Sequence, residues 1–182
     1  MRHLFSQDVP PFSRVLLVES GSRKVLEDFL SGIYDFHPNM KADLVTCYGG
    51  VPEHFRTDAG EVYRVTDYPG PKLRKHLFKQ LAANRYTIVG MICSDEPIMT
   101  KWKWALAARL PGKVFVLNEN CDYFWLDCWH WRVILHFALF RAGLTGSGAV
   151  RTPARLVLIP FALLYLILYA LIVHLRRKLR TL

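Results

Sequence analysis

The chain has 182 residues, of which 52% are hydrophobic, 21% charged and 13% aromatic. This length predicts one compact domain, and the composition excludes a disordered or collagen-like chain. Four cysteines exclude a disulfide scaffold. The net charge of +9 is unevenly distributed, because residues 1–127 hold 16 basic and 15 acidic side chains whereas residues 128–182 hold eight basic and no acidic ones. We therefore expect a near-neutral globular part followed by a basic, apolar end.

Residues 1–13 are expected to form an N-terminal arm. The segment 1–14 contains two prolines and lacks an apolar core long enough for a signal peptide. The globular part is therefore expected on the cytoplasmic side of a membrane, and the four cysteines are expected to be free thiols, as in a reducing compartment.

Residues 14–127 alternate between short β-rich runs and amphipathic helical patterns. Strands are predicted at 14–19, 42–48, 61–65, 86–93 and 113–117, and helices at 23–34, 71–84 and 97–110. Ser94, Asp95 and Glu96 before Pro97 are typical of a helix start. Strands separated by helices predict an α/β, Rossmann-like domain with a mainly parallel sheet of about five strands and flanking helices.

Polar residues follow four of the predicted strands. Ligands of such sheets bind beyond the carboxyl ends of the strands, near the point where the strand order reverses. These ends are residues 19–22, 47–50, 93–96 and 118–120. The candidate ligand-binding residues among them are Ser20, Gly21, Ser22, Ser94, Glu96, Asn118, Glu119 and Asn120. Lys101, on the predicted third helix, is a further candidate, because Lys101 and Lys103 with Trp102 and Trp104 can clamp an anionic lipid head or a pyrophosphate.

Each candidate also has a structural interpretation. Glu19 and Asp95 stand where a general base would act, but Asp95 and Glu96 also suit the first turn of a helix. The Ser20–Gly21–Ser22 turn can hold a phosphate through backbone N–H groups, or it can simply cap a helix. The lysines around Trp102 can equally form a solvated helix face.

Several stretches together resemble the N-terminal half of a GT-B glycosyltransferase, most closely the lipopolysaccharide heptosyltransferase group. The matching stretches are "HPNMKADLVTCYGG", "EVYRVTDYPGP", "LRKHLFKQLAANRYTIVGMIC" and "KWALAARLPGKVFVLNEN". Pro38 and Asp43–Val45 fit the second element of that half, and Ala107–Gly112 fits a helix end. The residues that fit the fourth element are Leu81, Arg85, Tyr86, Ile88 and Val89. The resemblance covers about residues 14–120 and implies sugar transfer from a nucleotide donor.

Two departures from the family pattern affect this expectation. The family has Gly-Asp at the first strand–helix turn, where the Asp is thought to act as the base, whereas this chain has Gly21–Ser22. The family's second Rossmann domain, which holds the nucleotide-sugar, is not expected after the fifth strand. The resemblance then implies the membrane-anchored half of a split enzyme, which faces a lipid-linked or envelope acceptor while a partner chain supplies the donor site.

Residues 128–150 are expected to form an amphipathic, membrane-proximal segment. The stretch 129–144 is apolar but carries Arg132, His136 and Arg141, so a helix in the lipid headgroup layer and a helix packed on the sheet remain alternatives. Cys121, Cys128 and His130 have a C-x6-C-x-H spacing, wider than that of usual zinc sites. We expect neither a metal nor a cofactor.

Residues 151–182 are expected to form a transmembrane anchor with a basic tail. Residues 156–173 form an 18-residue run without charge, and a helix of that length covers about 27 Å. The alternative is a buried core helix of a soluble protein. Because a single crossing would place Arg176–Arg180 on the far side, against the positive-inside tendency, a shallow in-plane insertion also remains open.

Together these features predict a membrane-anchored, glycosyltransferase-like protein. Glu19 and Asp95 are the candidate catalytic residues, and the partners are membrane lipid, a lipid-linked acceptor and a nucleotide-sugar-binding chain. The alternative is a non-catalytic scaffold or accessory subunit of a membrane complex that retains the glycosyltransferase-like fold. Nucleic acid is not expected as a partner, because the basic, acid-free segment lies beside the predicted anchor.

Overall fold

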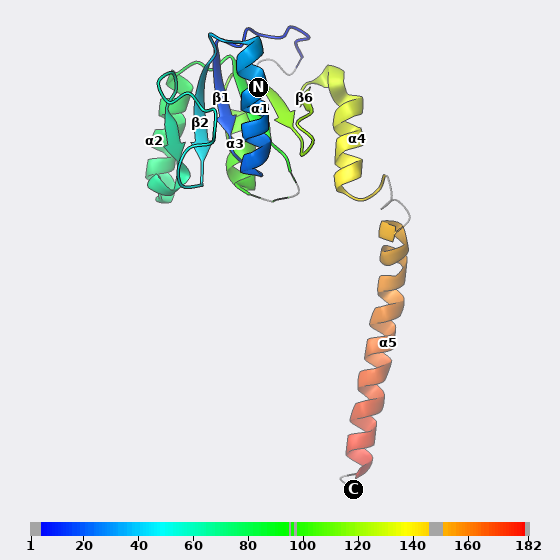
Figure 1. Ribbon diagram of the computed structural model, residues 1–182. Coiled ribbons are helices and arrows are strands. Elements are labelled where there is room, and N and C mark those ends of the chain that lie inside the picture. Colours follow the sequence, from blue (N-terminus) through cyan, green and yellow to red (C-terminus); the bar gives the residue numbers. More distant parts are fainter. Residues whose placement is uncertain (1–4, 95, 97, 146–150, 181–182) are drawn as a thin grey trace. The chain divides into compact units, whose positions relative to one another are not determined.

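Figure 1 shows the computed structural model of the chain, which describes residues 5–94, 96, 98–145 and 151–180. The chain divides into two compact units, Met1–Trp131 and Arg132–Leu182. The first unit is built around a β-sheet, and the second is helical.

The first unit is an α/β domain. Its strands are β1 (Arg14–Val18), β2 (Lys41–Thr46), β3 (Val62–Arg64), β4 (Ile88–Ile92), β5 (Lys113–Leu117) and β6 (Tyr123–Trp125). Its helices are α1 (Arg23–Phe36), α2 (Gly70–Ala83) and α3 (Thr100–Arg109), with single 3₁₀ turns η1 (Val65–Asp67) and η2 (Cys128–His130).

The six strands form one sheet in the order β3-β2-β1-β4-β5-β6. All neighbouring pairs are parallel except β5 and β6, which are antiparallel. The strand order therefore reverses between β1 and β4. Because β-α-β crossovers are right-handed, α1 covers one face of the sheet, and α2 and α3 cover the other (Figure 1).

The sheet supplies the core of the domain. Leu16, Leu44, Ile88 and Phe115 are at most 1% exposed, as expected for parallel strands covered on both faces. Gly90 makes room for the largest of these side chains, because a Cβ atom there would lie 2.3 Å from Cζ of Phe115.

The predicted α/β fold is confirmed, and three details differ from the sequence prediction. The sheet has a sixth strand, β6, whose three residues are too few for a periodic pattern. Helix α3 begins at Thr100 rather than Pro97, and its N-cap, Met99, has left-handed backbone geometry with φ of 50°. The sequence pattern places Leu73 on one helical face with Leu77 and Leu81, but in α2 only the latter two are buried and Leu73 is exposed.

A polar network around Asp43 lies inside this domain. The Asp43 carboxylate accepts hydrogen bonds from Tyr86 (2.6 Å) and from the backbone N–H of Glu61 (2.8 Å). Asn84 donates to the hydroxyl oxygens of Tyr86 and Tyr63. The Asp43 of the family resemblance is thus a buried structural residue.

A buried ion pair fixes part of the N-terminal arm. Nζ of Lys113 lies 3.1 Å from Oδ2 of Asp127, and it also donates to the backbone oxygens of Ser6 and Asp8. Burial alone would raise the pKa of Asp127, but its hydrogen bonds with His130 and Lys113 lower it. The carboxylate therefore stays charged opposite the buried ammonium group.

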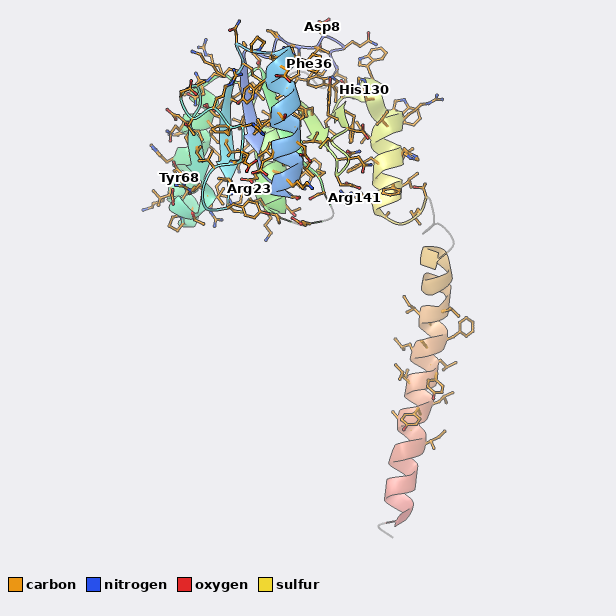
Figure 2. The ribbon with its side chains drawn as sticks, viewed as in Figure 1. Asp8, Arg23, Phe36, Tyr68, His130 and Arg141 are labelled. Carbon is orange, nitrogen blue, oxygen red and sulfur yellow. The ribbon has the colours of Figure 1, made fainter. Side chains whose placement is uncertain are left out.

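The second unit contains α5 (Arg151–Arg180) and, except for its first residue, α4 (Trp131–Arg141). No side chain of α4 is buried. The side chains of α5 are described from Leu158 to Ile172, and all fifteen are exposed (Figure 2). Among the described residues, no helix meets the length and apolarity needed to cross a membrane.

Candidate functional site

The carboxyl ends of β1, β2, β4 and β5 lie at one edge of the sheet, since these strands are parallel. The structure brings Glu19, Ser20, Gly21 and Ser22, which follow β1, next to residues that follow β2 and β4. We define this group, with Arg23, Thr46, Tyr48 and Ser94, as the strand-end cluster.

Glu19 is the buried centre of the strand-end cluster. It is fully buried, and its carboxylate accepts hydrogen bonds from Nε of Arg23 (2.7 Å), from Nη2 of Arg23 (3.2 Å) and from the hydroxyl of Thr46. A carboxylate with both oxygens occupied in this way holds its partners in place. Within this geometry Glu19 positions Arg23 and does not itself face a ligand.

Arg23, in the first turn of α1, connects three parts of the cluster (Figure 2). Its Nη1 donates to the backbone oxygen of Gly49 at 2.8 Å, and its guanidinium lies 5.0 Å from the ring centre of Tyr48. The hydrogen bond with Glu19 raises the pKa of Arg23, so the guanidinium stays charged. Its side chain is 28% exposed, which makes it the charged group that this cluster presents.

Sequence reasoning placed Tyr48 among the strand ends but missed Arg23 and Thr46. The Glu19–Arg23 spacing of four residues was a usable signal, because side chains at that spacing meet on a helix. Thr46 gave no comparable signal, since its partner Glu19 is remote in sequence. Burial and the negative charge of Glu96 raise the pKa of Tyr48, and its hydroxyl donates to the backbone oxygen of Gly21.

The Ser20–Gly21–Ser22 turn is held against the end of β4. Oγ of Ser20 donates to the backbone oxygen of Ile92 (2.7 Å), and the backbone N–H of Ser22 donates to Oγ of Ser94 (3.2 Å). A Cβ atom at Gly21 would lie 2.4 Å from that same Oγ and 2.7 Å from Cγ2 of Ile92, so a larger residue would require these side chains to shift. Ser22 is the N-cap of α1 but makes no side-chain capping bond. The turn therefore joins β1 to β4 at the point where the strand order reverses.

The acidic candidates after β4 are placed only in part. Asp95 lies outside the described residues. Glu96 is exposed, and it does not cap α3, because that helix begins four residues later. The capping interpretation of Glu96 was therefore wrong.

The three candidates after β5 form the turn into β6. Oδ1 of Asn118 accepts from the backbone N–H groups of Asn120 (3.0 Å) and Asp122 (2.9 Å), so Asn118 shapes the turn. Glu119 and Asn120 are exposed. Their predicted role in ligand binding stays a prediction.

Lys101 lies apart from the strand-end cluster, in a groove between α2 and α3. The cavity there has a volume of about 660 Å³, and Trp102 also lines it. Lys103 does not, because it is buried and its Nζ donates to the backbone oxygen of Ile92 (3.3 Å). Trp104 is 45% exposed and does not line the cavity either. The predicted clamp of two lysines and two tryptophans is thus reduced to Lys101 and Trp102.

The four cysteines are free, as predicted. Sγ of Cys121 contacts the backbone oxygen of Val25, whereas Cys128 is exposed in η2. Within the described ranges, no three His, Cys, Asp or Glu side chains are grouped so that they could hold a metal ion.

No known protein family, no curated protein and no solved structure matches this chain.

Proposed function

We propose that this chain is a membrane-anchored α/β domain that serves glycosyl transfer to a lipid-linked or envelope acceptor, as one half of a split enzyme. The observation that carries the anchoring is the surface of α5. Its side chains from Leu158 to Ile172 are all exposed, and the hydroxyls of Tyr165 and Tyr169 are the only polar groups among them. A helix that is apolar on every side requires apolar surroundings, and a lipid bilayer supplies them.

Basic residues on both sides of the uncharged run support this anchoring. Arg151 and Arg155 precede the run, and Arg176, Arg177 and Lys178 follow it. Cations near a bilayer surface gain about 1 kcal/mol each from anionic lipids. A single crossing and a shallow in-plane insertion both bury the apolar run, and they differ in the side on which the basic tail ends.

The transferase part of the proposal rests on the sheet and on the resemblance given above. The order β3-β2-β1-β4-β5 places polar side chains at the switch point between β1 and β4, where such folds bind ligands. Asp95 is the candidate base, and Glu19 holds Arg23, which is the charged group of the strand-end cluster. Where GT-B enzymes have a second domain, this chain has α4 and α5, so a partner chain would supply the nucleotide-sugar.

A second candidate function is a non-catalytic accessory subunit of a membrane complex. The full burial of Glu19 and its bonds to Arg23 and Thr46 favour it, because a base must reach the acceptor hydroxyl. In that case the domain keeps the glycosyltransferase-like fold as a binding scaffold.

Purification of the full chain with its partners from mild detergent, joined to mutagenesis, tests these candidates. A partner with a lone nucleotide-sugar-binding domain supports the split enzyme, whereas an unrelated complex supports the scaffold. In cells, Asp95→Ala should reduce glycolipid products at least tenfold, whereas Glu53→Ala, which removes an exposed carboxylate that is not a member of the strand-end cluster, should not. Unchanged glycolipids in a normally inserted Asp95→Ala protein would contradict the transferase.

Protease protection in sealed vesicles tests the anchor. A tag after Leu182 that is protected when the sheet domain is digested indicates a single crossing. Digestion of the tag to the same extent as the sheet domain indicates in-plane insertion. Removal of the chain from membranes by high salt alone would contradict either arrangement.

A further inference from the structure

The first 127 residues are close to neutral as a whole, but their charge is segregated. Helices α2 and α3 carry seven basic and no acidic side chains. The rest of residues 1–127 has nine basic and fifteen acidic side chains, a net charge of −6. Since α2 and α3 share one face of the sheet, the positive charge is concentrated on that face (Figure 1).

The groove between these helices combines an apolar floor with a cationic rim. Phe78 and Trp102 form the aromatic part of the floor, with ring centres 5.5 Å apart and an angle of 24° between the rings. The five cations around them are Arg74, Lys75, Lys79, Lys101 and Arg109. We call this feature the α2–α3 groove.

Two of the five cations in the α2–α3 groove lie over aromatic rings. The guanidinium of Arg109 lies 4.4 Å from the ring centre of Phe78, and that of Arg74 lies 5.7 Å from Trp102. Among the described residues, none of the five cations is within ion-pair distance of an acidic side chain. Five positive charges around one cavity repel one another, so an anion placed among them is stabilised.

We propose that the α2–α3 groove binds an anionic phospholipid, with the phosphate among the five cations and the apolar part of the lipid on Phe78 and Trp102. Its volume of about 660 Å³ lies within the usual range of ligand sites. Arginine and lysine are the side chains that bind phosphate groups. This inference rests on the proposed membrane anchoring, because the bilayer is the source of the lipid.

The same geometry argues against single-stranded nucleic acid. Such binding needs free aromatic faces on which bases stack. Here the faces of Phe78 and Trp102 contact each other and the two guanidinium groups. The cations also surround one cavity instead of following an extended track.

Native mass spectrometry of the full chain, purified in a neutral detergent, tests the proposal. The probes are phosphatidylglycerol, phosphatidylcholine, glycerol phosphate and a twelve-residue oligothymidylate. The groove variant is Lys75→Gln/Lys79→Gln/Lys101→Gln, in which all three changed residues are exposed. The control Lys24→Gln/Lys41→Gln/Arg64→Gln removes the same charge from exposed positions outside α2 and α3.

We expect phosphatidylglycerol to be retained at least tenfold more than phosphatidylcholine by the wild-type chain and by the control. The groove variant should lose most of this preference. Because α5 is identical in all three proteins, lipid that α5 holds does not contribute to the difference. Unchanged thermal melting of the groove variant shows that it is folded.

Three results would overturn the proposal. An equal preference for phosphatidylglycerol in both variants places the anion site elsewhere. If glycerol phosphate displaces phosphatidylglycerol at equal concentration, the groove binds a free phosphate and has no subsite for the apolar part of a lipid. If the wild-type chain and the control bind oligothymidylate, and the groove variant loses this binding but keeps its lipid preference, then the groove is a nucleic-acid site. Each result leaves the anchoring test of α5 unaffected, so the two proposals fail separately.

Discussion

The sheet and α5 use the same kinds of apolar side chain in opposite ways. In β1, β4 and β5 the aliphatic and aromatic residues are at most 4% exposed, whereas the large apolar residues of α5 from Leu158 to Ile172 are 50–66% exposed. The sheet domain therefore buries its apolar side chains against one another, whereas α5 leaves its apolar side chains exposed. The difference indicates that contacts within the chain stabilise the sheet, whereas the apolar surface of α5 needs apolar surroundings.

The largest effect is expected from charges placed in α5, which should weaken its association with the membrane. Leu164→Arg/Ile167→Arg puts two guanidinium groups near the middle of the apolar run. If lipid surrounds α5, insertion becomes less favourable by about 6 kcal/mol for the pair. The protein should then leave the membrane fraction in a carbonate wash, while Leu164→Val/Ile167→Val should stay. A doubly charged variant that remains bound as well as wild type would contradict a lipid environment.

Two phenylalanines, one in the sheet and one in α5, test whether apolar side chains of the two regions contribute differently to the stability of the sheet domain. Phe115 is 1% exposed and contacts Phe29, Tyr123 and Trp125, whereas Phe161 is 64% exposed. Phe115→Ala should lower the free energy of unfolding of the sheet domain by about 4 kcal/mol, because it leaves a cavity. Phe161→Ala should leave that free energy unchanged in urea titrations of the full chain in detergent. A similar loss in both variants would mean that α5 contributes to the core.

The smallest effect is expected from the buried tyrosines near Asp43. Burial, and then the hydrogen bond with Asp43, raise the pKa of Tyr86 above its usual value, and burial and Glu61 raise the pKa of Tyr63 to about 12. Unfolded tyrosine deprotonates near pH 10, where the folded groups keep their protons. Their contribution to stability is thus complete below pH 10 and is lost as the pH rises through the folded pKa values.

Tyr86→Phe should lower stability by about 1.5 kcal/mol at pH 7, since Asp43 loses a buried donor. It should also make the decline between pH 10 and 12 shallower than in wild type. Tyr123→Phe makes the same chemical change at an exposed position and should alter neither quantity. Thermal melts across this pH range provide the measurement, and identical slopes in all three proteins would contradict the assignment.

The sequence alone determined the elements that depend on local pattern. The aliphatic runs that became β1, β2, β4 and β5, and the stripe that buries Val25, Leu26 and Leu30 of α1, were all predictable, because strand and helix periods are written in consecutive residues. The uncharged run of residues 156–173 was equally plain. Three-residue β6 was not, since so short a strand depends on its pairing with β5.

Which polar side chains are buried and which are exposed to a ligand became apparent only from the tertiary structure. Glu19 is covered because Thr46, 27 residues away, bonds to it, and Ser20 is fixed by Ile92, 72 residues away. Lys101 and Lys103 are two residues apart in one helix, yet one lines a groove and the other is buried. Local sequence fixes the type of each side chain, but burial is set by non-local contacts, which appear only when the sheet is assembled.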